Sequence, residues 1–331
     1  MTWLMVAVTS YFINAGVYVA DKFLLSKKIH SSVAYAFFVG IWSIFNAIIL
    51  IFSPWMPTGK ELLIDLFAGV IFLATLIFWY KALHQSEATR VVPVVGALVP
   101  IFSFLLSWVF LNEKLSLDQF LAFIVLIAGG VLISVKRTKF YLLNVVKERV
   151  LNILGDVFGE YSAELNPANR LIINSVISAF FFAAYYVLMK YIYMHQPFIG
   201  SFVWSRFGTF IGVLLILLVP EWRRSIKDHN KEAKRPNNFS FFILVRFFAS
   251  LAFIMLNWAI SLGNVAMTNA LQGVQYLFLI ILVLVLSTKF PRFVNEELGR
   301  GVLVQKIIGV GLVSVGLYLL TLPVIEGITL K

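Results

Sequence analysis

Long, continuously apolar stretches recur along the chain, and each is about as long as a helix must be to cross a membrane. A hydrocarbon core about 30 Å thick needs about 20 apolar helical residues. A barrel strand would instead alternate in polarity over about 10 residues. The pattern therefore predicts an all-α polytopic membrane protein with ten transmembrane helices. The predicted spans are residues 3–25, 33–53, 62–83, 91–111, 117–136, 171–193, 199–219, 240–261, 265–287 and 303–322.

The composition excludes a soluble protein. Of the 331 residues, 60% are hydrophobic and 13% are charged, whereas a soluble domain carries about 25% charged residues. So few charges cannot cover the surface of a soluble protein of this size. The chain contains no cysteine, which excludes both a disulfide framework and a thiolate metal site.

The distribution of the positive charges indicates the orientation in the membrane. The 27 Lys and Arg residues exceed the 16 Asp and Glu residues by 11, a balance that in a soluble protein would suggest nucleic-acid binding. Here 21 of the cations lie in the loops after the first, third, fifth, seventh and ninth spans, and 4 lie on the opposite side. Because cation-rich loops stay in the cytoplasm, we expect a multi-pass protein of the cytoplasmic (inner) membrane with both termini extracytoplasmic. The charge then needs no nucleic-acid partner.

The two halves of the sequence resemble each other. Matching residues occur in the same order in both halves, and the offset between them grows only across loops. Each half holds five spans, and a unit with an odd number of spans inserts its second copy upside down. The sequence thus predicts two inverted five-helix repeats, an architecture in which one central site opens to alternate sides. The clearest matches are Ser10, Tyr18, Val19 and Lys22 with Ser178, Tyr186, Val187 and Lys190, and Asn112, Glu113 and Leu115 with Asn295, Glu296 and Leu298.

The repeats divide the chain into four segments. Residues 1–136 form the first repeat and residues 170–322 the second. Between them, residues 137–169 carry apolar side chains at helical spacing opposite charged ones, which predicts an amphipathic linker helix on the cytoplasmic surface. A regulatory partner site is the alternative for this linker. Residues 323–331 form a short extracytoplasmic tail.

A continuous set of motifs extends over the third to fifth predicted spans. It comprises Ala82-Leu83-His84-Gln85-Ser86-Glu87-Ala88, Arg90-Val91-Val92-Pro93, Pro100-Ile101-Phe102, Leu111-Asn112-Glu113-Lys114-Leu115-Ser116, Gln119 and Gly129-Gly130. On these motifs the chain resembles the EamA-type transporters of the drug/metabolite transporter (DMT) superfamily. The resemblance implies ten helices, alternating access and the movement of small organic solutes, often outward. The second half departs from it, because Pro93 and Pro100 correspond there to Ala270 and Leu277.

Polar and aromatic side chains within the spans are candidates for a solute pathway, because polar groups in hydrocarbon must be paired or face a cavity. The ninth span is the richest, since Asn269, Gln272 and Tyr276 share one face of a continuous helix there. Its amides could bind zwitterions, sugars or amide-bearing solutes. Hydrogen bonds between helices and aromatic belts at the membrane surface are the alternatives. The candidate substrate-binding residues are Tyr11, Asn14, Tyr18, Trp79, Tyr80, Tyr185, Arg206, Arg246, Asn257, Trp258, Asn269, Gln272, Gln275 and Tyr276.

Two arginines and one kinked segment have alternative interpretations. Arg206 and Arg246 are the cations deepest in the spans, and they either snorkel to the membrane surface or clamp an anion. Pro93, Gly96 and Pro100 in the fourth span form either a hinge or a fixed kink. Glycines in the fifth and tenth spans predict close helix packing, within one chain or at the face of a homodimer. These glycines are Gly129, Gly130, Gly309, Gly311 and Gly316.

No grouping typical of an enzyme is visible. The acids Asp21, Glu87 and Glu113 lie at span ends, so we expect no buried acid suited to a proton relay. No Ser, His and Asp set or carboxylate pair occurs, and we expect no catalytic residue, metal or cofactor. The sequence favours a carrier of small organic solutes in the lipid bilayer, with a flippase of lipid or lipid-linked substrates, or a membrane scaffold, as the alternative. The histidines, His30, His84, His195 and His229, are scattered over span ends and loops.

Overall fold

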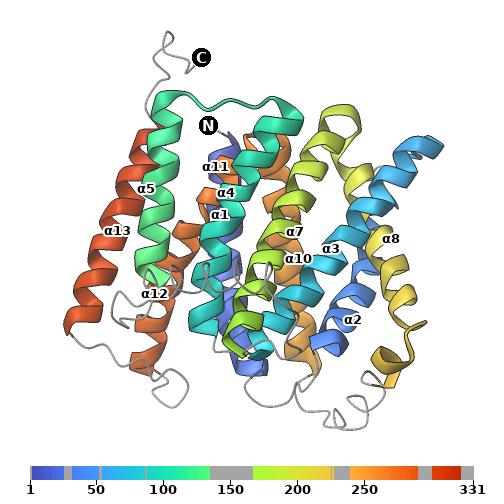
Figure 1. The fold of residues 1–331 in the computed structure, drawn as a ribbon, viewed down its shortest axis with the longest axis horizontal. Helices are drawn as coiled ribbons and strands as arrows, with labels where there is room; N and C mark the ends of the chain where they lie inside the picture. The colour runs from blue at the N-terminus through green and yellow to red at the C-terminus, as the bar shows by residue number, and fades with distance from the viewer. Residues whose placement is uncertain are drawn as a thin grey trace, which may run out of the picture.

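The computed structural model describes residues 2–25, 32–51, 54–85, 88–134, 167–224, 226, 239–289 and 300–321. These ranges are built of helices and contain no strand (Figure 1). The first half contains α1 (Thr2–Leu25), α2 (Ser32–Trp42), the 3₁₀ helix η1 (Ser43–Ile51), α3 (Gly59–Gln85), α4 (Ala88–Leu111) and α5 (Leu117–Ser134). The second half contains α7 (Pro167–His195), α8 (Phe198–Ile216), α10 (Phe239–Leu262), α11 (Val265–Ala270), α12 (Gln272–Lys289) and α13 (Arg300–Thr321).

Several of these helices can cross a membrane. Six are long and apolar enough to do so, namely those that contain Thr2–Ala20, Gly59–Ala82, Val94–Leu111, Ile173–His195, Phe198–Ile216 and Ile243–Leu262. Shorter apolar helices cover Ala36–Ile51, Leu117–Ile133 and Val304–Leu320. The prediction of an all-helical membrane protein is confirmed at this level. Most of the predicted linker 137–169 and the whole tail 323–331 lie outside the described residues.

The second predicted span is not one regular helix. It begins as α2 and changes to the tighter η1 at Ser43. The Ser43 hydroxyl lies 2.5 Å from the carbonyl oxygen of Gly40, one turn earlier in α2, and 3.0 Å from the carbonyl oxygen of Arg206, in α8. A serine hydroxyl that bonds back to its own helix competes with the regular backbone ladder. The change of helix type therefore coincides with a contact that depends on the tertiary structure.

The ninth predicted span, residues 265–287, is also corrected, because the helix breaks at Leu271 between α11 and α12. Asn264 caps α11, its side-chain oxygen accepting from the backbone N–H of Met267 at 3.1 Å. After the break, Gly273 approaches α5 so closely that an added Cβ would lie 3.2 Å from the Cα of Gly130. The face that we predicted for a continuous helix therefore does not extend across Leu271.

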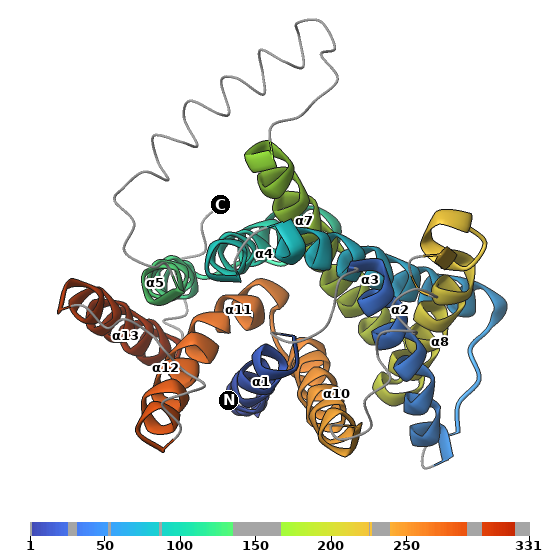
Figure 2. The ribbon, with the colours of Figure 1, turned by 90° about the horizontal axis from the view of Figure 1, so that it is seen from below.

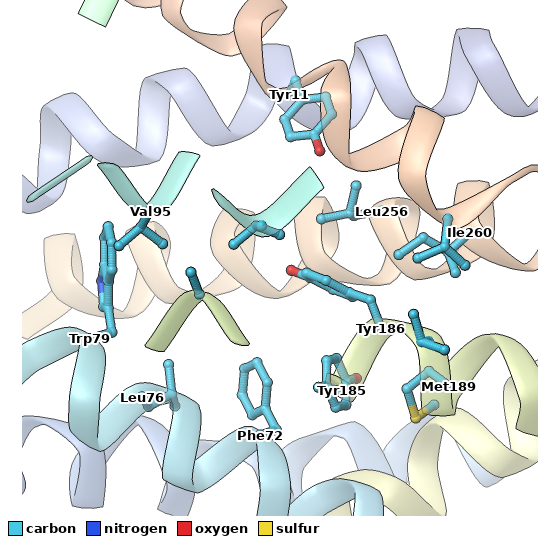
Figure 3. Packing of buried hydrophobic residues seen from close by; sticks show 14 of the residues in the cluster. Tyr11, Phe72, Leu76, Trp79, Val95, Tyr185, Tyr186, Met189, Leu256 and Ile260 are labelled. Atoms are coloured by element: carbon cyan, nitrogen blue, oxygen red, sulfur yellow. The ribbon is translucent and has the colours of Figure 1, made fainter. Parts of the chain in front are cut away.

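The helices that meet at the middle of the bundle come from both halves. α1 packs against α10 and α12, α4 against α7 and α11, and α3 against α7 and α8. Viewed from below, α5 and α13 lie at one side of the molecule and α2 and α8 at the other (Figure 2). The buried cluster between them is rich in aromatic rings, among them Tyr11, Phe72, Tyr185 and Tyr186 (Figure 3).

Glycines allow several of these helices to touch through their backbones. A Cβ on Gly129 of α5 would lie 2.9 Å from the carbonyl oxygen of Gly309 in α13, and a Cβ on Gly309 would lie 2.9 Å from that of Gly129. Gly316 meets Leu126 in the same interface. The predicted close packing of these glycines is thus found within one chain. Gly311 differs, since nothing lies within 4 Å of the position of its Cβ.

Candidate functional site

Two hydrogen bonds join α1 to the broken ninth segment at the centre of the bundle. The Tyr11 hydroxyl donates to the carbonyl oxygen of Thr268 in α11 at 3.0 Å. The side-chain nitrogen of Asn14 donates to Oε1 of Gln275 in α12 at 3.3 Å. Polar side chains three residues apart lie on one face of a helix, so α1 presents both to the same neighbour.

Four tyrosines gather around this point. Tyr18, Tyr186 and Tyr276 all lie near Tyr11, and they come from α1, α7 and α12. In Figure 3 the hydroxyls of Tyr11 and Tyr186 face the space between their helices. The structure therefore brings together five of the residues predicted from the sequence: Tyr11, Asn14, Tyr18, Gln275 and Tyr276.

The predicted hinge contacts this cluster. The Tyr276 hydroxyl lies directly against Gly96, where a Cβ would collide with it. α4 runs without a break from Ala88 to Leu111, through Pro93 and Pro100. Gly96 thus provides the space for a tyrosine side chain in this conformation. Whether these residues also act as a hinge stays a prediction.

A small recess beside Tyr276 lies between α4, α5, α11 and α12. Its volume is about 10 Å³, which is at the lower limit for one water molecule. An organic solute does not fit there unless the helices move apart. The lining residues are Gly96, Ala97, Leu126, Ile127, Gly130, Val131, Ala270, Gly273 and Tyr276.

A second polar cluster surrounds Arg206. This side chain is 3% exposed, and its Nη2 donates to the Tyr185 hydroxyl at 2.6 Å. The guanidinium carbon lies 4.2 Å from the ring centroid of Phe72, 4.8 Å from that of Phe253 and 5.4 Å from that of Phe202. Such burial excludes the snorkelling that the sequence left open. The rings stabilise the cation through their negatively polarised faces.

Asn257 extends this cluster. Its Oδ1 accepts from the hydroxyls of Tyr193, at 3.0 Å, and of Tyr185, at 3.3 Å. Its Nδ2 donates to the carbonyl oxygen of Phe253 one turn earlier in α10, at 2.9 Å. Three helices, α7, α8 and α10, are therefore connected by a chain of hydrogen bonds that begins at Arg206.

A buried acid that we did not predict lies at the start of α3. Asp65 has no exposed surface, and the Gln196 side-chain nitrogen donates to its two carboxylate oxygens at 3.0 and 3.1 Å when the amide is oriented toward it. Asp65 is additional to the acids at span ends, and the absence of a proton relay stays a prediction. A sequence signal was available, since Ala68 and Gly69 follow Asp65 at the spacing of one buried helix face.

At one end of the bundle, a charged side chain joins two helices of the second half. Nζ of Lys190 donates to the carbonyl oxygens of Ile260 and Ser261, each at 3.1 Å, and of Gly263, at 2.7 Å. A cation at the end of a helix satisfies carbonyls that have no partner within the helix. Lys190 therefore caps α10 and fixes it to α7.

The motif loop after α4 reaches the same region. Oε2 of Glu113 accepts from the Asn264 side-chain nitrogen at 2.8 Å. Asn112 has a φ of 53°, the left-handed conformation that ends many helices. Ser116 and Gln119 then form a capping box, in which each side chain bonds the backbone N–H of the other, at 3.1 and 3.3 Å. This box starts α5.

Replacing Glu113 with glutamine is expected to change how stability depends on pH. Burial raises the pKa of Glu113, although Lys190 opposes the shift. A carboxyl whose pKa is raised on folding destabilises the fold when it ionises. The wild type should therefore lose stability, relative to Glu113→Gln, as the pH rises from about 4.3 through the raised pKa. Thermal unfolding of both proteins over this range checks it, and parallel curves would contradict it.

The remaining predicted residues make contacts of their own outside the two clusters. The Asn269 side-chain nitrogen donates to the Ser103 hydroxyl at 2.8 Å and so faces α4. Trp258 is 43% exposed, on a different side of α10 from the buried Asn257. Trp79 packs edge-on against Phe182. Arg246 is buried, whereas Tyr80 and Gln272 are half-buried. Among the described residues, no group of three or more His, Asp and Glu side chains could hold a metal ion.

Comparison with known proteins agrees with the first half of this fold. Residues 1–135, which include α1 to α5, match the EamA-like transporter family. The match covers less than half of the chain, so it shows a likeness of this part to that family. The family lies within the DMT superfamily, so the resemblance drawn from the motifs is confirmed. EamA members are membrane transporters and not enzymes.

Solved structures extend the likeness to the whole chain. Fourteen chains of solved structures match. One of them, described as a crystal structure of a protein, is 13% identical, with a TM-score of 0.61 over 96% of this chain and 94% of its own. At this identity the likeness shows the fold alone. No curated protein sequence matches the chain.

Proposed function

We propose that this EamA-like protein is a secondary carrier that moves small organic solutes across the cytoplasmic membrane by alternating access, in the outward direction. The observation that carries the proposal is that its first five helices match a transporter family. The central cluster of Tyr11, Asn14, Tyr186, Gln275 and Tyr276 supports it. These side chains can donate and accept hydrogen bonds in the middle of an apolar bundle, as a site for a polar solute requires.

The helix contacts support two inverted repeats. Exchanging the halves pairs α1 with α7, α3 with α10, α4 with α11 and α12, and α5 with α13. α3 packs against α7, and their counterparts α10 and α1 also pack against each other. In the same way, α4 packs against α7, and their counterparts α12 and α1 pack against each other. α5 packs against its own counterpart, α13. The family match also stops where α5 ends, which supports 1–136 as one repeat.

One contact departs from this symmetry in the way that alternating access requires. Both α2 and α8 pack against α3. By contrast, α10, which is the counterpart of α3, makes only a minor contact with α8. In carriers built from inverted repeats, the two halves exchange conformations when the site changes sides. In the second state of this protein, the pair of α2 and α8 would therefore pack against α10.

Alternating access can be tested without knowing the solute, because the chain contains no cysteine. We expect a single cysteine at Ala97, beside the central recess, to react with a membrane-impermeant thiol reagent from outside in intact cells and from the cytoplasmic side in inverted vesicles. A thiol reacts as the thiolate, which forms only where water reaches it. Labelling measured by gel shift reports both reactions.

A matched control lies in the same helix. Leu105 of α4 is exposed on the outer surface of the bundle, where lipid would surround it. A cysteine at Leu105 should react from neither side. Reaction of the Ala97 cysteine from one side alone, in cells and in vesicles, would contradict alternating access and favour a scaffold.

A further inference from the structure

Arg206 is a buried cation without an acid partner. Its side chain is 3% exposed, eight residues into α8, or about 12 Å along the helix. Within the described ranges, no carboxylate contacts its guanidinium, and Nε is buried without a hydrogen-bond acceptor. A buried charge is costly in a membrane protein unless it is paired. The positive charge and the Nε–H group of Arg206 are therefore available to bind an anion.

The aromatic rings around Arg206 stabilise part of its positive charge. Phe72, Phe202 and Phe253 lie 4.2 to 5.4 Å from the guanidinium carbon, and the Tyr185 ring lies at 5.3 Å. Rings stabilise a guanidinium through its faces, but they accept no hydrogen bond from the N–H groups along its edge. The four rings therefore hold the guanidinium in place and leave part of its N–H edge for a ligand.

The buried acid Asp65 is engaged elsewhere. The carboxylate of Asp65 accepts both of its hydrogen bonds from Gln196. Both Asp65 and Arg206 influence Tyr193 electrostatically, so they share one region of the bundle without contacting each other. Among the described residues, no carboxylate neutralises Arg206 in this conformation.

Arg206 lies close to the central cluster. It donates to Tyr185, the neighbour of Tyr186, and acts electrostatically on Tyr186 itself. The Tyr186 hydroxyl faces the central space in Figure 3. A solute held among the central tyrosines could thus extend an anionic group toward Arg206 once the helices separate.

We propose that the transported solute carries a single carboxylate on an apolar, preferably aromatic, body, and that Arg206 binds this carboxylate. The proposal rests on the carrier function proposed above. A guanidinium matches a carboxylate with two parallel hydrogen bonds. One carboxylate neutralises the one charge of Arg206, whereas a dianion would leave a buried negative charge near Asp65. The four rings would contact the apolar body.

Three probes of similar shape test this class. Phenylacetate, phenylacetamide and benzylphosphonate differ in the charge of one group. We expect phenylacetate to raise the melting temperature of the full-length protein in lipid nanodiscs in proportion to the logarithm of its concentration. Phenylacetamide and benzylphosphonate should produce little or no shift. This comparison uses the wild type, so it does not depend on whether a variant folds.

Variants then locate the effect. Arg206→Gln should lose the shift with phenylacetate, and Arg206→Lys should retain a smaller one, because lysine keeps the charge but not the planar fork. Lys306→Gln removes another buried cation, in α13, and should keep the full shift. An equal shift with the amide, a shift that survives in Arg206→Gln, or no shift with any of phenylacetate, indole-3-acetate and hydrocinnamate would overturn the proposal.

The labelling experiment separates this inference from the carrier function. Two-sided reaction of the Ala97 cysteine without any carboxylate response would leave the carrier function standing and overturn the solute class. One-sided reaction would overturn the carrier function, and with it the inference that rests on it.

Discussion

Replacing Gly208 with leucine is expected to prevent the protein from folding. Gly208 of α8 lies directly against the backbone of Leu66 in α3, and Gly69 lies against the backbone of Ser205 in return. A Cβ at position 208 would overlap with main-chain atoms that cannot rotate away. Overpacking of a rigid site costs about 3 kcal/mol, and here the two helices must also separate. The expected result is the loss of most of the monodisperse protein on size-exclusion chromatography.

Gly311→Leu is the matched control for this substitution. Gly311 is also a helical glycine, in α13, but nothing lies within 4 Å of the position of its Cβ. The same change should leave yield and melting temperature nearly unaltered there. If Gly208→Leu behaved like Gly311→Leu, the result would contradict the close contact between the backbones of α3 and α8.

The limits of most helices could be predicted because they depend on composition alone. The predicted span 171–193 lies within α7, Pro167–His195, and the predicted span 117–136 nearly coincides with α5, Leu117–Ser134. Both are continuous apolar runs with polar ends, so the thickness of the hydrocarbon fixes their length. No partner helix is needed to recognise them.

The two irregular helices could not be predicted, because contacts between distant residues define them. η1 begins where the Ser43 hydroxyl meets the backbone of Arg206, 163 residues later. The break at Leu271 precedes the contact of Gly273 with Gly130. A hydropathy pattern registers neither contact, and a continuous helix is its default prediction.

The candidate site, too, could be predicted in part from the sequence. The cost of polar groups in hydrocarbon selected Tyr185, Arg206 and Asn257 individually, and the structure joins them in one network. The sequence could not show that they meet, since they lie on three helices. Trp258 was selected together with Asn257, yet adjacent helical residues differ in direction by about 100°. The burial of its neighbour Asn257 therefore does not extend to it.

Gln196→Leu is expected to destabilise the protein strongly, because it removes both hydrogen bonds to the buried carboxylate of Asp65. Leaving a buried acceptor without its hydrogen-bond donors costs about 1 to 3 kcal/mol, and more when the acceptor is charged. Gln196→Glu should be worse still, since it places a second carboxylate beside the first. Thermal unfolding in detergent measures both effects. A melting temperature equal to that of the wild type would show that Asp65 is stabilised by other groups.

The double variant Asp65→Leu/Gln196→Leu should recover most of the stability that Gln196→Leu loses. The penalty of the single variant arises from a charge left without donors, and exchanging both partners for apolar side chains removes that charge. Recovery would identify the carboxylate as the source of the loss. If the double variant were instead less stable than Gln196→Leu, the packing of Asp65 would matter more than its charge. Asp65 would then stabilise the contact of α3 with Gln196 mainly by filling space.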